Sequence, residues 1–361
     1  MRGSRVTVVI PLFNRRRVVA DALASVAAQT LPPARLIVVD DGSTDGGSQA
    51  VLRWFVQSSS GTACRLITQA NQGVSAARNR GLDLADDHEF VAFLDSDDVW
   101  PPDFLERTVA TLSSDPRAVA VTTDRCIETP GNGDGLHIDS SALPWQPAVW
   151  MLQHGANLAS SSLFRVAALV RRGGFDTALR TGEDSALFLP LSLDGPWLHA
   201  PGRPVVLRQG LAEALGDEGN LSARFFDNRR TWAAIYERFF TTAGLAMVAE
   251  PNCRRLLAVA WYQAGCELVA QRAHRQAATC FRKAIAWRPS RARYYWHFAR
   301  AWREVIWPRS SSNGDCPSAP TPAAPPARPM ARLDTSIHAA PARPEFGHSR
   351  NRAEPAIIER G

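Results

Sequence analysis

Along the first third of the chain, short apolar runs typical of buried strands alternate with apolar residues at helical spacing. The first apolar run, Val6–Ile10, consists of β-branched residues and predicts a buried strand. Apolar residues then recur at helical spacing from Val18 to Ala27, and a Pro-Pro pair ends that helix. The next run, Leu36–Val39, predicts a second strand. Two strands that are apolar throughout, on either side of an amphipathic helix, indicate a βαβ unit in a parallel sheet.

The same alternation continues beyond this unit. It predicts further helices and strands, with helices over residues 46–57 and 73–84 and strands over residues 64–68, 90–94 and 118–122. The segment Thr129–Pro147 is rich in glycine and proline and is expected to form a mobile loop, and a further module follows over residues 157–207. The fold class predicted is α/β, with a Rossmann-like and mostly parallel sheet.

The last third of the chain has a different pattern. Beyond Asn220 apolar residues recur at helical spacing, and residues 260–289 predict two antiparallel helices. From Ser310 onward Pro, Ala, Arg and Ser dominate, a composition that cannot bury a core. We therefore expect three parts: an α/β domain over residues 1–222, a small helical region over residues 223–307 and a disordered tail over residues 308–361.

Arginine supplies nearly all of the positive charge of this chain. The chain has 361 residues, a formal net charge of +6 and a single lysine, Lys283. A basic chain can bind nucleic acid, a membrane surface or a nucleotide, but no nucleic-acid-binding motif is present, so we expect no nucleic-acid partner. No apolar run reaches the ~18 residues of a transmembrane helix. The N-terminus also lacks the features of a secretory signal, so the chain is expected to be cytoplasmic.

The strand predicted over residues 90–94 ends in the acidic sequence Asp95-Ser96-Asp97-Asp98. Neighbouring carboxylates repel each other when they lose water, unless a cation compensates them. Hard oxygen ligands suit Mg²⁺ or Mn²⁺, and these ions commonly bind phosphates. The sequence therefore suggests a metal-assisted site for a phosphorylated substrate. The alternative is a solvated loop, or acids that cap a helix beginning near Asp103.

Three polar loops follow predicted parallel strands, at residues 11–14, 40–43 and 95–98. In open α/β sheets, ligands bind outside the carboxyl ends of the strands. We therefore expect the three loops to converge on one site.

Six motifs in a fixed order resemble those of the family 2 inverting glycosyltransferases. Among them are Pro-Leu-Phe-Asn, Val-Asp-Asp-Gly-Ser, Phe-Leu-Asp-Ser-Asp-Asp and Gly-Glu-Asp, and all six lie at residues 6–14, 38–45, 71–82, 93–98, 173–176 and 182–184. The resemblance covers about residues 4–222. It implies the GT-A fold, a nucleotide-diphospho sugar as donor, and a divalent metal, Mn²⁺ or Mg²⁺, as cofactor.

The resemblance also implies roles for individual residues. The metal ligand would be Asp97, with Asp95 beside it. Arg78 could reach the diphosphate, or could instead form a structural ion pair with the acidic loops. The residues implied in binding the nucleotide-sugar are Pro11, Phe13, Asn14, Asp41, Arg78 and Asp95.

Glu183 and Asp184 match the family's catalytic acid pair, with Asp184 as the general base. In inverting transfer an acceptor hydroxyl attacks the anomeric carbon and the nucleoside diphosphate leaves, so one base and one metal suffice. The acceptor implied is a cell-surface glycan or a lipid-linked oligosaccharide, bordered by residues 129–157. The two acids could also simply open a helix.

One feature of the family is missing. Many members carry a histidine after a late strand that can complete the metal site, whereas the matching stretch here is Val205–Gln209, and His199 comes too early. Arg208 could instead supply positive charge to the diphosphate.

Other functions and partners stay open at this point. A nucleotidyltransferase would show a glycine-rich basic loop after the first strand, which residues 11–14 lack. A glycan-binding or scaffold protein with lapsed catalysis would not need Asp97 or Asp184. Residues 260–289 resemble a single tetratricopeptide repeat, which could bind a protein partner. Arginines of the tail could attract an anionic membrane, so peripheral contact with the inner membrane face is a further possibility.

Overall fold

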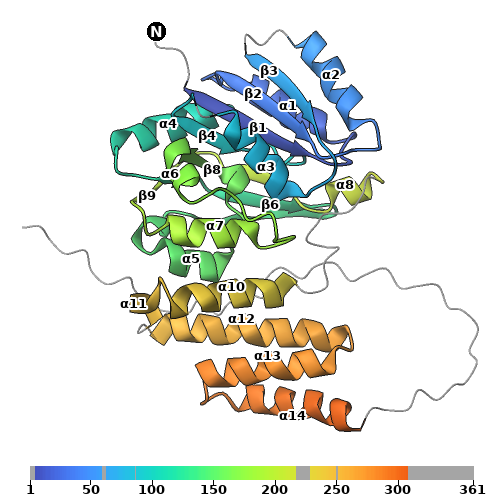
Figure 1. The fold of residues 1–361 in the computed structure, drawn as a ribbon, viewed down its shortest axis with the longest axis vertical. Helices are drawn as coiled ribbons and strands as arrows, with labels where there is room; N and C mark the ends of the chain where they lie inside the picture. The colour runs from blue at the N-terminus through green and yellow to red at the C-terminus, as the bar shows by residue number, and fades with distance from the viewer. Residues whose placement is uncertain (1–4, 59–61, 86, 217–227, 249–250, 308–361) are drawn as a thin grey trace, which may run out of the picture. The chain divides into compact units, whose positions relative to one another are not determined.

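A seven-stranded, mostly parallel sheet forms the centre of the first two thirds of the chain (Figure 1). Its strand order is β3-β2-β1-β4-β8-β5-β9, in which β8 runs antiparallel to β4 and β5 and the other neighbours are parallel. A smaller sheet has the order β10-β6-β7. The structure, a computed structural model, describes residues 5–58, 62–85, 87–216, 228–248 and 251–307. The predicted fold class is confirmed.

The strands are β1 (Val6–Leu12), β2 (Arg35–Asp40), β3 (Ala63–Thr68), β4 (Phe90–Phe93), β5 (Ala120–Thr122), β6 (Arg125–Thr129), β7 (Asn132–Ile138), β8 (Ser162–Arg165), β9 (Trp197–His199) and β10 (Val205–Arg208). The helices before residue 220 are α1 (Val19–Ala27), α2 (Gly47–Gln57), α3 (Val74–Asp83), α4 (Phe104–Ser114), η1 (Leu143–Trp145), α5 (Pro147–His154), η2 (Ala159–Ser161), α6 (Val166–Arg171), α7 (Glu183–Leu191) and α8 (Leu211–Ala214).

The order of the strands reverses between β1 and β4. From β1 the chain moves outward to β2 and β3, then returns to pair β4 on the other side of β1. In open α/β sheets, ligands bind at such a switch point, outside the carboxyl ends of the strands. The loops after β1 and β4, which carry residues 13–14 and 95–98, therefore border the expected site.

Helix α3 packs unusually close to β1. A side-chain carbon added at Gly81 would lie 2.2 Å from Cγ1 of Val9, so even a methyl group does not fit there. Arg78 is one turn before Gly81 on the same face of α3, and it is buried as well. The glycine therefore brings the arginine down to the sheet.

The expectation of a mobile loop over residues 129–147 was wrong. Strands β6 and β7 form an antiparallel hairpin, in which Gly131 takes a left-handed φ of 83° at the turn. Helix α5 then begins at Pro147. Glycine and proline mark the turn of a hairpin as readily as a long loop, and the pattern of composition alone does not distinguish them.

Helices dominate the chain after residue 228. They are α10 (Asn228–Thr241), α11 (Leu245–Val248), α12 (Pro251–Ala270), α13 (His274–Trp287) and α14 (Ala292–Ile306). Helices α10, α12, α13 and α14 stack one on the next (Figure 1). The predicted helical region is confirmed, with a third helix, α14, added to the expected pair. The resemblance of that pair to a tetratricopeptide repeat stays a prediction.

Helix α10 connects this stack to the α/β part. The Tyr236 hydroxyl donates to the carbonyl of Met151 in α5, at 2.8 Å. At the other contact, a side-chain carbon at Gly182, just before α7, would lie 2.8 Å from Cδ1 of Trp232. The first turn of α7 therefore rests directly on α10.

Among the described residues, no helix is long and apolar enough to cross a membrane.

We expect Gly81→Ala to lower the free energy of unfolding by about 1–3 kcal/mol, because the added methyl group overpacks the contact with Val9. At an exposed helix position, replacing glycine with alanine would stabilise the protein by up to about 1 kcal/mol. A loss of stability would therefore show that the contact with Val9 outweighs this gain. Urea denaturation measures it. In the double variant Gly81→Ala/Val9→Ala, the loss should be smaller than the sum of the single losses. Strict additivity would contradict the close packing.

Candidate active site

The polar loops after β1, β2 and β4 meet at one edge of the sheet, as predicted. The amide of Asn14 donates to Oγ of Ser43 at 3.0 Å, and Oδ1 of Asn14 accepts the amide of Thr44 at 2.8 Å. Nε of Arg15 lies 3.5 Å from Oδ2 of Asp97. These contacts hold the β1 loop between the other two.

Arg78 joins the two acidic motifs of the site. Its Nη2 donates to Oδ1 of Asp95 at 2.8 Å, and its Nη1 donates to Oε1 of Glu183 at 3.0 Å and Oδ1 of Asp184 at 3.1 Å. Its guanidinium also lies over the ring of Phe175. Burial opposes the charge of Arg78, but the three carboxylates outweigh it and raise the pKa of this arginine. Of the two roles expected for Arg78, the structure shows the ion pair with the acidic loops.

The carboxylates of the site outnumber its cations. Burial raises the pKa of Asp97 to about 6, reinforced by the charge of Asp95 and opposed by Arg15. Burial likewise raises the pKa of Asp184 to about 8, although Arg78 opposes the shift. Such shifts mean that the ionised forms lack compensation. A divalent cation would provide it, and the carboxylate oxygens of Asp95 and Asp97 suit Mn²⁺ or Mg²⁺.

Arg208 lies where the family's late histidine was expected. Its amide donates to Oδ1 of Asp98 at 3.1 Å, and its Nε donates to the carbonyl of Asp97 at 2.6 Å. Its Nη1 pairs with Asp21 at 2.7 Å. Arg208 therefore holds the backbone of the acidic loop in place. Asp98 is buried and accepts one of the hydrogen bonds of this structural contact.

Asp41 is buried and holds the loop that leads into α3. Its Oδ1 accepts the side-chain amide of Gln69 and the backbone amide of Gln72, at 2.8 and 2.9 Å, and its Oδ2 accepts the amide of Gly73 at 2.7 Å. Pro11 is buried at the end of β1, and Phe13 is half-buried beside it. The roles of these residues toward a nucleotide stay predictions.

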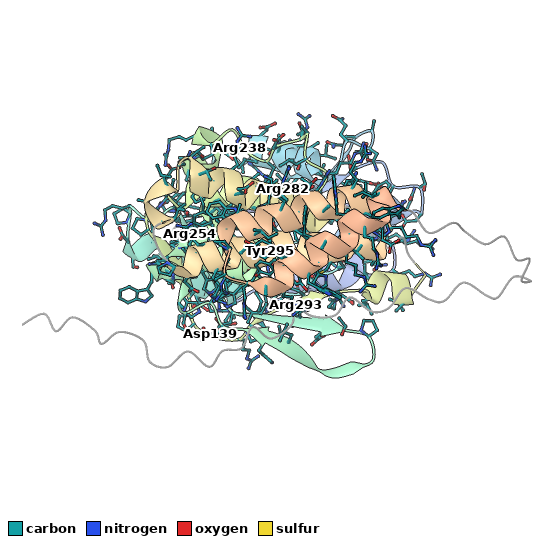
Figure 2. All side chains as sticks on the ribbon, turned by 90° about the horizontal axis from the view of Figure 1, so that it is seen from below. Asp139, Arg238, Arg254, Arg282, Arg293 and Tyr295 are labelled. Carbon is teal, nitrogen blue, oxygen red and sulfur yellow. The ribbon has the colours of Figure 1, made fainter. Side chains whose placement is uncertain are left out.

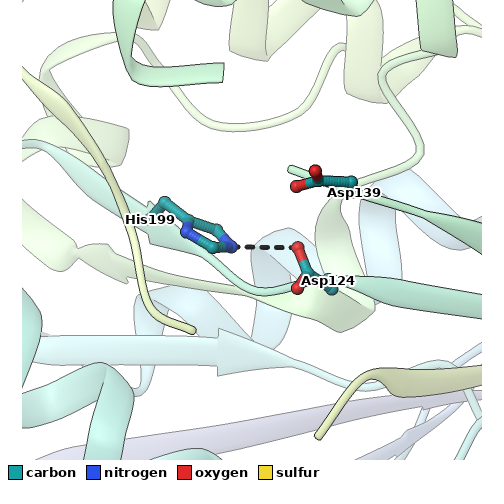
Figure 3. Close-up of side chains that lie close together, drawn as sticks. All are labelled: Asp124, Asp139 and His199. Carbon is teal, nitrogen blue, oxygen red and sulfur yellow. Dashed lines mark hydrogen bonds and ion pairs between the residues drawn. The ribbon is translucent and has the colours of Figure 1, made fainter. Parts of the chain in front are cut away.

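A second group of possible metal ligands was missed by the sequence analysis. Figure 3 shows Asp124, Asp139 and His199, whose ligand atoms all lie within 4.8 Å of one another. Nε2 of His199 and Oδ1 of Asp124 are hydrogen-bonded at 2.9 Å, and the two carboxylates also accept the amides of Ser140 and Ser141. These bonds account for the group without an ion. The signal in the sequence was an acid, Asp124, two residues after β5.

Arg125 was also missed. It is fully buried, and its Nη1 donates to the carbonyl and Oδ1 of Asn157, at 2.7 and 2.9 Å. Burial lowers the pKa of Arg125 to about 10, and attraction to Tyr236 and Asp184 opposes the shift. It therefore adds positive charge on the side of the site near Asp184.

Residues 7–172 match the family described as Glycosyl transferase family 2. The succinoglycan biosynthesis protein ExoW of Rhizobium meliloti is 41% identical over 104 residues, which are 28% of this chain and 32% of that protein. This chain matches 33%, 47% and 32% of the length of three curated relatives, so it spans between about a third and about a half of each.

Solved structures share the fold. S. aureus TarS 1-349 in complex with UDP-GlcNAc superimposes with a TM-score of 0.54 at 17% identity, covering 83% of this chain and 91% of that one. The mannosyltransferase PcManGT from Pyrobaculum calidifontis, in complex with GDP-Man and Mn2+, gives 0.51 at 21% identity, covering 86% and 89%. The expected GT-A fold is confirmed.

We expect Arg78→Met to lower the free energy of unfolding by about 3 kcal/mol or more, because three carboxylates lose their buried counter-charge. Arg80, two residues further along the same helix, is exposed, and Arg80→Met should change stability by less than about 0.5 kcal/mol. Thermal and urea denaturation of both variants test the comparison. Equal losses would show that Arg78 does not hold the site together.

Proposed function

Because residues 7–172 form a family 2 glycosyltransferase domain, we propose that this protein is an inverting transferase. It moves a sugar from a nucleotide-diphosphate donor to a hydroxyl group of a cell-surface glycan or a lipid-linked oligosaccharide. The observation that carries the proposal is the contact of Arg78 with both Asp95 and Asp184, since it brings the proposed metal site and the proposed base into one place.

The loops after β1 and β2 would bind the donor nucleotide-sugar. Pro11, Phe13, Asn14 and Asp41 would bind the nucleotide of the donor; the complexes of TarS and PcManGT contain UDP-GlcNAc and GDP-Man. Oδ2 of Asp41 accepts one hydrogen bond, from Gly73, and a carboxylate oxygen has two lone pairs. It therefore retains the capacity to accept a bond from a base or a ribose hydroxyl.

Asp97 and Asp95 would hold a divalent metal, Mn²⁺ or Mg²⁺. The metal would neutralise the charge that develops on the leaving diphosphate. The oxygen donors and the uncompensated negative charge at these two residues favour such an ion. Arg15, beside Asp97, would attract the diphosphate from the same side.

Asp184 would act as the general base. As the acceptor oxygen forms its bond to the anomeric carbon, the bond from that carbon to the diphosphate breaks, and the acceptor proton passes to Asp184. Burial raises the pKa of Asp184, so its ionised form is a stronger base than an ordinary carboxylate, and a cation bound at the neighbouring acids would favour that ionised form. Glu183 shares Arg78 with Asp184 and would keep it in position.

These observations support sugar transfer better than they support the two other functions, nucleotidyl transfer and a non-catalytic scaffold. The family assignment favours sugar transfer over nucleotidyl transfer. A scaffold protein with lapsed catalysis would not need one buried arginine to bring Asp95 and Asp184 together. The name of ExoW supports a polysaccharide as the acceptor.

We retain the three-part division of the chain as a proposal. The boundary at residues 222–223 lies outside the described residues, and so does the tail over residues 308–361. The contacts of α10 with α5 and α7 support a role for residues 228–307 as a helical support of the catalytic part.

Asp97→Asn should weaken Mn²⁺-dependent binding of UDP or GDP by at least about 10-fold, because the amide removes a charged metal ligand. Isothermal titration with each nucleotide, with and without Mn²⁺, measures the effect. Asp83→Asn is the control, since Asp83 is exposed at the end of α3. Unchanged affinity in Asp97→Asn would remove Asp97 from the metal site.

Asp184→Asn should keep nucleotide binding but reduce turnover ~10²-fold or more, because the amide cannot accept the proton. Release of UDP or GDP from a panel of nucleotide sugars gives the rate, with Asp83→Asn again as control. Turnover close to that of the parent would exclude Asp184 as the base.

A further inference from the structure

The outer face of α14 carries a cluster of exposed aromatic and aliphatic side chains. Five of the 14 exposed large apolar residues of the described chain lie within its last 13 residues, and all are at least 44% exposed: Tyr295, Trp296, Trp302, Ile306 and Trp307. Tyr295, Trp302 and Ile306 recur at helical spacing, so they form a single stripe. A neighbouring face of α14, with Tyr294 and Ala301, is buried against the preceding helices.

The same helix is strongly basic. Arg291, Arg293, Arg300 and Arg303 are exposed, and Glu304 is the single acidic residue between positions 291 and 307. The guanidinium of Arg300 lies over the ring of Trp296, with 5.5 Å to the centroid. Figure 2 looks onto this end of the molecule and shows Arg282 and Arg293 on either side of Tyr295. Arginines therefore border the apolar stripe.

Such a face is unexpected at the end of a helical stack. The last helix of a stacked array normally has a polar outer face, because no further helix covers it. Here α14 is the last described helix, and the stripe residues Tyr295, Trp302 and Ile306 are 44–50% exposed. Its composition matches that of helices that lie in a membrane interface, where Trp and Tyr enter the headgroup layer and arginines contact anionic lipid.

We propose that the outer face of α14 docks this protein on a membrane surface that carries anionic lipid. The positive charge of the face is complementary to such a surface. The same charge disfavours a second copy of the chain as the occupant, because a symmetric contact would place the arginines of one α14 against those of the other. The helix lies on the surface and does not cross it, in keeping with its 15 residues. The proposal does not depend on the proposed catalysis.

Sedimentation of the full-length protein with vesicles tests the proposal. The parent should bind vesicles of phosphatidylcholine mixed with phosphatidylglycerol, should bind phosphatidylcholine alone much less, and should be released as salt is raised. The variant Trp296→Ser/Trp302→Ser/Trp307→Ser should bind at least about 10-fold more weakly, because it loses the three exposed tryptophans of the cluster. The variant Arg293→Gln/Arg300→Gln should bind roughly 30-fold more weakly, since each arginine contributes about 1 kcal/mol near the surface.

Matched controls lie elsewhere on the surface. Trp145→Ser removes a tryptophan that is 81% exposed, and Arg65→Gln/Arg171→Gln removes two exposed arginines, so both should bind like the parent. All variants keep residues 308–361, so any attraction of the tail to lipid is the same in each. Mn²⁺-dependent UDP binding should also match the parent in every variant.

Three results would overturn the proposal. The first is equal sedimentation of the parent on neutral and anionic vesicles. The second is equal sedimentation of the parent and the α14 variants on anionic vesicles. The third is a parent dimer in light scattering that the triple tryptophan variant dissociates, because the face would then be covered by a second copy.

Discussion

The guanidinium of Arg78 determines how the two acidic motifs approach each other. It is buried, and it donates to carboxylates that come from the loop after β4 and from the first turn of α7. A buried charge is costly unless it is paired and hydrogen-bonded, so α3, the acidic loop and α7 are held in one arrangement. The position of the proposed base relative to the proposed metal ligands therefore follows from this arginine.

The close packing of α3 on β1 allows Arg78 to reach the carboxylates. Gly81 lets α3 approach β1 until no side chain fits between the helix and Val9. At the other end of the site, Arg208 bonds the backbone of the acidic loop and Asp98. Arginines thus fix the carboxylates from two sides, while the excess of negative charge is left facing the place where a cation and a diphosphate would bind.

The C-terminal helices take part in the same architecture. Gly182, whose left-handed φ of 81° precedes α7, is packed against Trp232 of α10. The helix that carries Asp184 therefore rests on the helical stack, so the stack contributes to the geometry of the site. The stack also presents α14 outward, away from this contact, with its aromatic and basic face.

The sequence by itself determined the α/β class, most strands and helices, the helical region, and the edge of the sheet at which the acids gather. It could do so because apolar periodicity is local, and because parallel strands always present their carboxyl ends at one edge. It did not reveal the hairpin at residues 125–138, since composition does not distinguish a turn from a long loop. Only the tertiary structure decided which side chains meet. Arg78 pairs with residues 17 and about 105 positions away, and His199 meets Asp124 because β9 lies beside β5, with β8 inserted antiparallel between β4 and β5. Strand order sets those distances, and no local pattern in the chain encodes it.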